Sequence, residues 1–185
     1  ADGSITNFSD IKRAPSIFGG RAIRHTFEWG DSLLLATDFG IVVLNLKNGF
    51  FRDTRYIGQD GNQLTVNQLD IDYDAGVIYA ATEIGLLQAA LNSPLRFFSS
   101  WSLVAGAHAE EARFAAVSAA GVLYTKRSNN DLHDSIYLVN NGVRSLMPNQ
   151  LGGVIQELER GVEGLEVVYP FNAMLYDNAF NVLAN

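Results

Sequence analysis

Short runs of apolar residues alternate with turn residues along the whole chain, and no stretch keeps a 3.6-residue period for long. Near the start, these runs predict strands at 23–28, 32–37, 41–46 and 51–57. Glycine, aspartate and asparagine separate the runs at 30–31, 38–40 and 48–49, and such residues tolerate the positive φ of tight hairpin turns. The pattern predicts short antiparallel strands joined by hairpins.

The same grouping of four strands recurs three more times. The second group is expected at 66–73, 77–82, 85–90 and 101–104. The third group is expected at 112–118, 121–127, 135–140 and 143–147. The fourth group is expected at 154–160, 164–169, 173–177 and 181–184. Four antiparallel strands in about 40–45 residues are typical of one blade of a β-propeller.

A sequence repeat supports this grouping. Ala-Thr-Asp-Phe-Gly at 36–40 recurs as Ala-Thr-Glu-Ile-Gly at 81–85, offset by 45 positions. The same offset relates Gly76 to Gly121, each followed by an apolar run, and a fainter copy begins at Gly164. Internal repeats of this length indicate a fold built of similar, neighbouring units.

We therefore predict an all-β fold, a β-propeller of about four four-stranded antiparallel blades. The expected blades are 23–57, 66–104, 112–147 and 154–184, after a lead-in from a preceding blade at 1–22. Blades stack face to face, which accounts for continuously apolar runs such as 33–36 and 41–44. Propellers have roughly four to eight blades, so four copies are either a complete propeller or part of a larger one. A β-sandwich with irregular repeats is the alternative fold.

Composition narrows the chemistry. The net charge is −7 and the basic residues form no block, so nucleic acid is not expected as a partner. The absence of cysteine excludes disulfides, thiolate catalysis and cysteine-based zinc sites. The apolar runs are too short to cross a bilayer, so an integral membrane protein is not expected.

The sequence contains none of the common catalytic or cofactor motifs, namely a phosphate-binding glycine loop, a nucleophile elbow or an HExxH helix. We therefore predict no enzymatic activity, catalytic residue, cofactor or metal site. Residues 70–76 begin like a calcium loop, but Ala75 and Ala81 stand where an EF-hand needs glycine and glutamate. We interpret this segment as a strand with Asp70 and Asp72 on its solvent face, followed by a turn.

The three histidines are not spaced to chelate one metal ion: His25, His108 and His133. His133 lies beside Asp131 and Asp134 in a long hairpin, where a histidine–aspartate contact is one interpretation and a solvated tip is the favoured one.

Aromatic residues gather near strand ends in the first two blades. They are expected mainly in blade interfaces, with stacking against a saccharide as the alternative: Trp29, Phe50, Phe51, Tyr56, Phe97, Phe98 and Trp101.

Ligand binding is expected on one end of the propeller. The loops between the second and third strands of each blade share a face with the connections between blades, and loops on a rigid scaffold commonly carry binding sites. The candidate ligand-binding residues in these loops are Asp38, Glu83, Lys126, Arg127 and His133.

Several segments resemble the amino-terminal propeller of the PorZ family, accessory proteins of the type IX secretion system with two-component-regulator-like propeller repeats. The resemblance is carried by residues 10–13, 39–44, 53–58, 78–86, 92–95 and 98–101, with a weaker likeness at 170–173.

This resemblance implies a non-enzymatic protein of the periplasm or cell surface of a Gram-negative bacterium. It implies a role in cargo maturation through contacts with anionic lipopolysaccharide and with the sortase component of the secretion system. A periplasmic glycan-sensing propeller of a hybrid two-component regulator is the alternative function, and a polysaccharide lyase would be a third.

The family propeller has seven blades, so the resemblance implies that these four belong to a larger ring. Two terminal blades would then present apolar faces, and we expect the isolated chain to associate with itself through 23–57 and 154–184.

Overall fold

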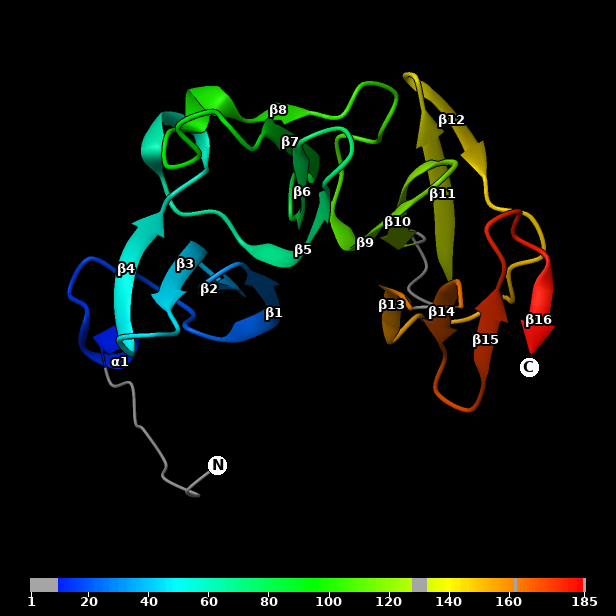
Figure 1. The fold of residues 1–185 in the computed structure, drawn as a ribbon, viewed down its shortest axis with the longest axis horizontal. Coiled ribbons are helices and arrows are strands. Elements are labelled where there is room, and N and C mark those ends of the chain that lie inside the picture. Colours follow the sequence, from blue (N-terminus) through cyan, green and yellow to red (C-terminus); the bar gives the residue numbers. More distant parts are fainter. Residues whose placement is uncertain (1–9, 128–132, 162, 185) are drawn as a thin grey trace.

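The computed structural model describes residues 10–127, 133–161 and 163–184. These residues form four separate sheets, each of four antiparallel strands in chain order (Figure 1). The prediction of an all-β propeller fold with four four-stranded blades is confirmed. None of the helices in the described part of the chain has the length and apolar character needed to cross a bilayer.

The strands are short and evenly distributed over the blades. The first blade comprises β1 (Ile23–Trp29), β2 (Ser32–Thr37), β3 (Gly40–Asn45) and β4 (Phe50–Arg55). The second comprises β5 (Val66–Asp72), β6 (Val77–Thr82), β7 (Gly85–Ala90) and β8 (Ser102–Leu103). The third comprises β9 (Ala112–Ser118), β10 (Gly121–Arg127), β11 (Asp134–Asn140) and β12 (Val143–Leu146). The fourth comprises β13 (Glu157–Arg160), β14 (Leu165–Val168), β15 (Ala173–Tyr176) and β16 (Val182–Ala184).

Within the described residues, helical structure is confined to single turns. The α-helical turn α1 (Asp10–Arg13) precedes the first blade, and the 3-10 turns η1 (Gln59–Gly61) and η2 (Phe98–Ser100) lie in loops.

The blades follow one another in an arc, with the first strand of each on the inside and the fourth on the outside (Figure 1). Along the inside, β1 contacts β5, β5 contacts β9, and β9 contacts β13. We call the line that these innermost strands surround the axis. Because each sheet is separate, side chains rather than backbone ladders must join the blades.

Buried apolar clusters lie between successive blades. Each of three clusters takes fully buried side chains from two neighbours: Leu34 with Ile78, Leu86 with Tyr124, and Leu123 with Tyr176. Burying a large apolar side chain contributes about 1.5–3 kcal/mol, so these clusters are the main force that stacks the blades. The continuous apolar runs noted in the sequence are continuous because both faces of those strands are covered.

The outward face of the first blade is covered by the segment that precedes it. Leu35 and Val42 on this face are 4% and 1% exposed, and Ile17 is buried against them together with half-buried Ile11 and Ala14. The expectation that this terminal blade exposes an apolar face is therefore wrong.

The fourth blade differs because its strands alternate. In β14, Val167 is fully buried against the third blade, whereas its neighbour Glu166 is exposed on the outward face. The expectation of a continuously apolar outward face is wrong here too, since alternation places polar groups on the side away from the core.

Polar side chains of β5 bond to the free backbone edge of β9. Asn67 Nδ2 donates to the Ala112 carbonyl at 2.8 Å, and Asp70 Oδ2 accepts from the Val117 N–H at 2.6 Å. An innermost strand has one edge without a neighbouring strand, and buried backbone groups there need partners. These side chains supply them.

Gln68 extends the same bonding to the fourth blade. It is 5% exposed, its Oε1 accepts from the Ala115 N–H at 3.2 Å, and its Nε2 donates to the Leu158 carbonyl at 3.0 Å. One buried amide therefore joins three blades near the axis.

The carboxylate of Asp70 does not lie on a solvent face, and that expectation is corrected. Besides Val117 it accepts from the Ile71 N–H at 2.7 Å, and burial raises the pKa of the Asp70 carboxyl against the lowering effect of these bonds. Asp72 instead accepts from the Ala75 N–H at 2.8 Å in the hairpin turn. Two of the three carboxylates in this segment, those of Asp70 and Asp72, thus have structural bonds.

The repeated Ala-Thr-acid-X-Gly sequence forms the same turn in two blades. Thr37 Oγ1 donates to the Gly40 carbonyl at 2.8 Å, and Thr82 Oγ1 donates to the Gly85 carbonyl at 2.7 Å. Gly40 has φ +139° and Gly85 has φ +129°, values that residues other than glycine rarely adopt. The need for glycine at both positions, expected from the repeat, is confirmed.

Substituting valine at either glycine should destabilise the protein by about 1–3 kcal/mol through backbone strain, with a steric clash in addition. A Cβ at Gly40 would lie 2.2 Å from the Arg55 carbonyl oxygen, and one at Gly85 would lie 2.7 Å from that of His108. Urea unfolding measures the loss. Gly30→Val is the matched control, because Gly30 has φ +58° but open space around its Cβ. Equal losses in all three variants would contradict the role assigned to the clash.

Removing the carboxylate at the axis should cost more than removing its neighbour. Asp70→Ala leaves the buried Val117 N–H without its acceptor, and we expect a loss of about 1–3 kcal/mol. Asp70→Asn keeps an acceptor oxygen and should recover part of the loss. Asp72→Ala, the control in the exposed turn, should lower the free energy of unfolding by about 0.5 kcal/mol. Indistinguishable urea midpoints for the two alanine variants would contradict the assignment.

Candidate functional site

Asp38 was expected to bind ligand, but the structure places it as a brace at the start of the first blade. Its Oδ2 accepts from the Ala22 N–H at 2.9 Å, and its Oδ1 accepts from Arg24 Nε at 2.6 Å. Its side chain is 14% exposed. The carboxylate therefore has its bonds inside the blade and orients an arginine.

Glu83 takes the equivalent position in the second blade. Its Oε1 accepts from the Thr65 N–H at 3.0 Å, while its own N–H donates to the Thr65 carbonyl at 3.3 Å. Asp38 and Ala22 are joined by the same reciprocal backbone bond, at 3.2 Å. In the first two blades, the acid of the repeat thus hydrogen-bonds to the residue that directly precedes the innermost strand.

The three candidates of the third blade lie around the hairpin between β10 and β11. Lys126 Nζ lies 2.6 Å from Glu110 Oε2, and this hydrogen bond lowers the pKa of the Glu110 carboxyl. Arg127 and His133 are exposed. Of the two aspartates considered as partners of His133, Asp131 lies outside the described residues, and Asp134 contacts Arg113 and the Ile155 N–H. Among the described contacts, none joins Asp38, Glu83 and Lys126 to one another.

A hollow at the axis gathers polar side chains that the sequence did not single out. Arg24, Asn67 and Arg113 are each the second residue of an innermost strand, and Gln156 directly precedes β13. A hollow of about 310 Å³ is lined by these four and Phe114. We call these five residues the axial mouth. Its volume lies at the low end of the range for small-molecule sites.

The two arginines of the axial mouth are each held by one aspartate. Arg24 is 44% exposed and pairs with Asp38, while Arg113 is 27% exposed and lies 3.3 Å from Asp134 Oδ2. Asp134 is fully buried, and its Oδ2 also accepts from the Ile155 N–H at 2.7 Å. Arg24 contacts its aspartate through Nε alone and Arg113 through Nη1 alone, so other guanidinium nitrogens can contact a ligand.

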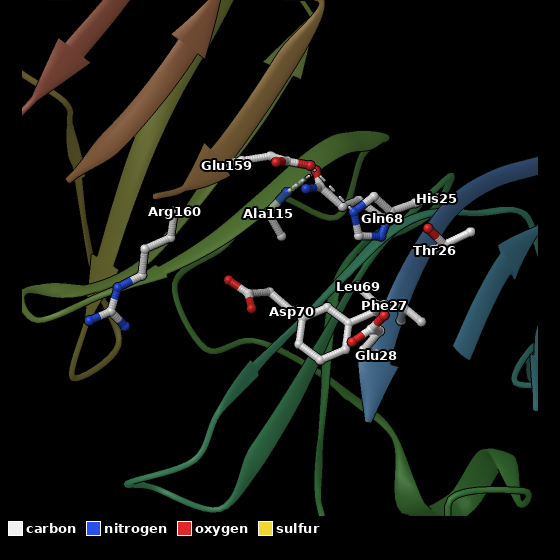
Figure 2. A pocket seen from close by; sticks show the side chains of 10 residues that line it. All are labelled: His25, Thr26, Phe27, Glu28, Gln68, Leu69, Asp70, Ala115, Glu159 and Arg160. Atoms are coloured by element: carbon white, nitrogen blue, oxygen red, sulfur yellow. Dashed lines mark hydrogen bonds and ion pairs between the residues drawn. The ribbon is translucent and has the colours of Figure 1, made fainter. Parts of the chain in front are cut away.

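The axial mouth continues inward. A hollow of about 380 Å³ shares most of the mouth and adds His25, Gln68, Glu157 and Glu159. A smaller hollow of about 200 Å³ follows, and it is lined by three of the same residues, His25, Gln68 and Glu159 (Figure 2). These three form a waist between the two spaces.

At the waist, the first and fourth blades meet. His25 of β1 and Glu159 of β13 point toward each other, with His25 Nε2 3.8 Å from Glu159 Oε1 (Figure 2). Burial lowers the pKa of His25, and nearby Glu157 opposes that shift. Burial, then Glu159 and Glu166, raise the pKa of the Glu157 carboxyl. The site therefore combines two arginines with a histidine and a glutamate whose pKa values are shifted by burial.

This arrangement can bind a polar or anionic group. Guanidinium groups donate paired, charge-assisted hydrogen bonds to phosphate or carboxylate, and planar amides and carboxylates suit hydroxyl groups. Among the described residues, no group of three or more histidine, aspartate and glutamate side chains is placed to hold a metal ion. Of the aromatic residues considered for saccharide stacking, Trp101 is buried in the core, and Phe50 and Phe97 are half-exposed away from the mouth.

The comparisons with known proteins identify the family. The sequence model of the TSS9 PorZ N-terminal beta-propeller domain matches residues 1–102, more than half of the chain. This chain belongs to that family. The match covers the first two blades, which contain most of the segments that carry the resemblance. The resemblance is thereby confirmed. No curated protein sequence matches the chain.

Solved structures from B. thetaiotaomicron share the fold. The extracellular domain of the hybrid two component system BT4673 is similar with a TM-score of 0.60 and 9% identity, over 88% of this chain. That of BT3049 is similar with a TM-score of 0.62 and 11% identity, over 92% of this chain. The PorZ-family chain spans only 21% and 24% of those two chains. At such low identity the likeness concerns the fold alone.

The sequence did contain a signal for the axial mouth. Arg24, Asn67 and Arg113 are polar residues at the same register of three repeated strands that are otherwise largely apolar or alternating. Once the strands are aligned by the repeat, a polar ring at their starts follows from propeller geometry. The prediction based on loops alone chose Asp38 instead. Asp38 accepts a hydrogen bond from Arg24 and does not line the mouth itself.

Proposed function

We propose that this domain is a non-enzymatic binding module of a type IX secretion accessory protein, in the periplasm or at the cell surface. It aids cargo maturation by binding anionic lipopolysaccharide at the axial mouth and the sortase component on the surrounding loops. Membership of the PorZ family supports the secretion role. The observation that carries the ligand assignment is the pair of braced guanidinium groups, Arg24 and Arg113, on one hollow.

Bracing makes these arginines suited to an anionic sugar group. Asp38 and Asp134 restrict the side chains, so less conformational entropy is lost when a phosphate or carboxylate binds. Phe114, over whose ring Arg113 lies at 5.3 Å, gives the same hollow an apolar surface. A ligand with a charged group next to a hydrocarbon ring would contact the guanidinium groups and the ring of Phe114 at the same time.

Because the net charge of the protein is −7, an anionic ligand is attracted only by the positive groups close to it. An anionic ligand gains nothing from the overall field of the protein, so the direct contacts must supply the affinity. We expect modest binding that depends strongly on the geometry of the mouth.

The remaining candidate residues suit a protein partner. Glu83, Arg127 and His133 are exposed in the hairpin loops between second and third strands, and Phe171 in the equivalent loop of the fourth blade is 97% exposed. Exposed loops carrying charges and an aromatic side chain are typical of protein contact surfaces. We assign the sortase contact to this face.

The glycan-sensor alternative has less support. The hybrid two-component domains share only the fold, whereas the family match concerns the sequence of this chain itself. We therefore favour the secretion role.

Neutralising one arginine of the axial mouth should weaken binding of purified anionic lipopolysaccharide roughly tenfold, because charge-assisted hydrogen bonds contribute about 1.5–3 kcal/mol. Arg24→Gln is the first variant, since Arg24 is the more exposed and its loss leaves the core intact. Arg96→Gln is the matched control, because Arg96 is exposed in the loop after β7 and outside the mouth. Biolayer interferometry at fixed ionic strength gives the affinities.

Lipopolysaccharide that lacks the anionic substituent serves as the control ligand and should bind the unmodified chain weakly. Equal affinities for the two lipopolysaccharides, or equal losses in the Arg24 and Arg96 variants, would remove the axial mouth from the proposal.

Self-association of the isolated chain is a further proposal, now limited to the fourth blade. Its outward face has a hollow of about 470 Å³ in which Ala173, Leu175 and Ala184 lie beside Glu163 and Glu166. Light scattering should show a concentration-dependent increase in mass, which Leu175→Glu abolishes. Leu183→Glu, at an exposed residue outside the hollow, is the control and should have little effect. A constant monomer mass at all concentrations would contradict the proposal.

A further inference from the structure

We propose that anion binding at the axial mouth is coupled to protonation of His25 and Glu157, so that the mouth holds an anion more tightly at mildly acidic pH. This inference rests on the site of the proposed function and adds its regulation. It starts from geometry. Both residues line the same 380 Å³ hollow as Arg24, and His25 directly follows Arg24 in β1.

The charges around this hollow come from every innermost strand. On β1 they are Arg24, His25 and Glu28; on β5, Asp70; on β9, Arg113; and on β13, Glu157, Glu159 and Arg160. Asp38 and Asp134 pair with Arg24 and Arg113, and Glu166 of β14 stands opposite Glu159 in the ladder. Asn67 and Gln68 of β5 are neutral and have bonds to backbone groups. The balance in the 380 Å³ hollow therefore depends on few groups.

Protonation reverses the sign of that balance. At neutral pH the lining of the 380 Å³ hollow has one positive charge, Arg24, against the two carboxylates of Glu157 and Glu159. With His25 and Glu157 protonated, two positive charges face one carboxylate. Protonation of both groups makes the charge around the hollow more positive by two, so an anion is attracted more strongly, or repelled less, below neutral pH.

The surroundings disfavour the charged form of both groups. His25 Nδ1 is buried without a hydrogen-bond partner within the described residues, so a proton there lacks an acceptor. Burial accordingly lowers the pKa of His25, while burial and the neighbouring carboxylates raise the pKa of Glu157. The two groups thus titrate closer together than free histidine and glutamate do.

The sign of the linkage follows. An anion in the hollow stabilises protonated His25 and neutral Glu157, so it raises the pKa of both groups. By reciprocity, protonation of either group raises the affinity for the anion by the same factor. Affinity should therefore increase as the pH falls through the lowered pKa of His25 and the raised pKa of Glu157.

Sulfate is a suitable probe for the full chain, because its charge is constant over the relevant pH range. We expect its affinity, measured by NMR titration at constant ionic strength, to rise about fivefold or more from pH 8 to pH 5.5, within the usual range of coupling between sites. The same experiment should show a higher pKa for the His25 ring at saturating sulfate. His108, which packs against Tyr124 and Tyr137 outside the hollow, should keep its pKa.

Two variants separate the coupled groups from general pH effects. His25→Gln should remove most of the pH dependence, and Glu157→Gln should raise sulfate affinity at pH 8. Glu163→Gln, which removes an exposed carboxylate outside the hollow, is the control and should leave both quantities unchanged. Should His25→Gln fail to fold, the ring titration of the unmodified chain and the Glu157 variant still decide the question.

Sulfate affinity that is independent of pH, or absent at every pH, or equally pH-dependent in His25→Gln, would overturn the inference. These results are distinguishable from failure of the proposed function. Lipopolysaccharide that binds through Arg24 without any pH dependence would leave the function standing and remove the coupling. Proton-linked sulfate binding without lipopolysaccharide binding would leave the coupling standing and remove the proposed function.

Discussion

The unpaired inner edge of each blade is the constraint on which the rest of this structure depends. A sheet edge presents backbone N–H and carbonyl groups without strand partners, and near the axis those groups are removed from water. Here Asn67, Gln68 and Asp70 of β5 extend across to the backbone of β9 and β13. Apolar clusters provide most of the attraction between blades, but these directional bonds set how the innermost strands align.

The same requirement produces the candidate site. At the start of the inner strands, Asp38 bonds to the Ala22 N–H, and Asp134 bonds to the Ile155 N–H. Each carboxylate has a second contact with an arginine, which is thereby held at the axial mouth. The two guanidinium groups stand on one hollow because the acids that hold them also accept hydrogen bonds from backbone N–H groups near the starts of the inner strands. Structure and binding chemistry share the same residues, so a change at either aspartate would affect both.

Much of the architecture could be predicted from local pattern. Gly40 and Gly85 indicated hairpin turns with positive φ, and the continuously apolar strands indicated coverage of both sheet faces. The functional residues were harder. Asp38 and Glu83 looked like ligand groups because acids in loops are commonly solvated, yet each accepts from a backbone N–H 16 or 18 residues earlier in the chain. Nothing in the local sequence indicates that such a donor lies within reach.

The sequence by itself determined the strands, their hairpins and their grouping into four blades, because periodicity, glycine turns and the internal repeat act over a few neighbouring residues. Only the tertiary structure decided which polar side chains face the axis and what they bond. It covered the outward face of the first blade with Ile11, Ala14 and Ile17, and it brought His25 to Glu159 from the opposite end of the chain. Such pairings depend on how separate sheets stack, and that geometry has no counterpart in the spacing of residues along the chain.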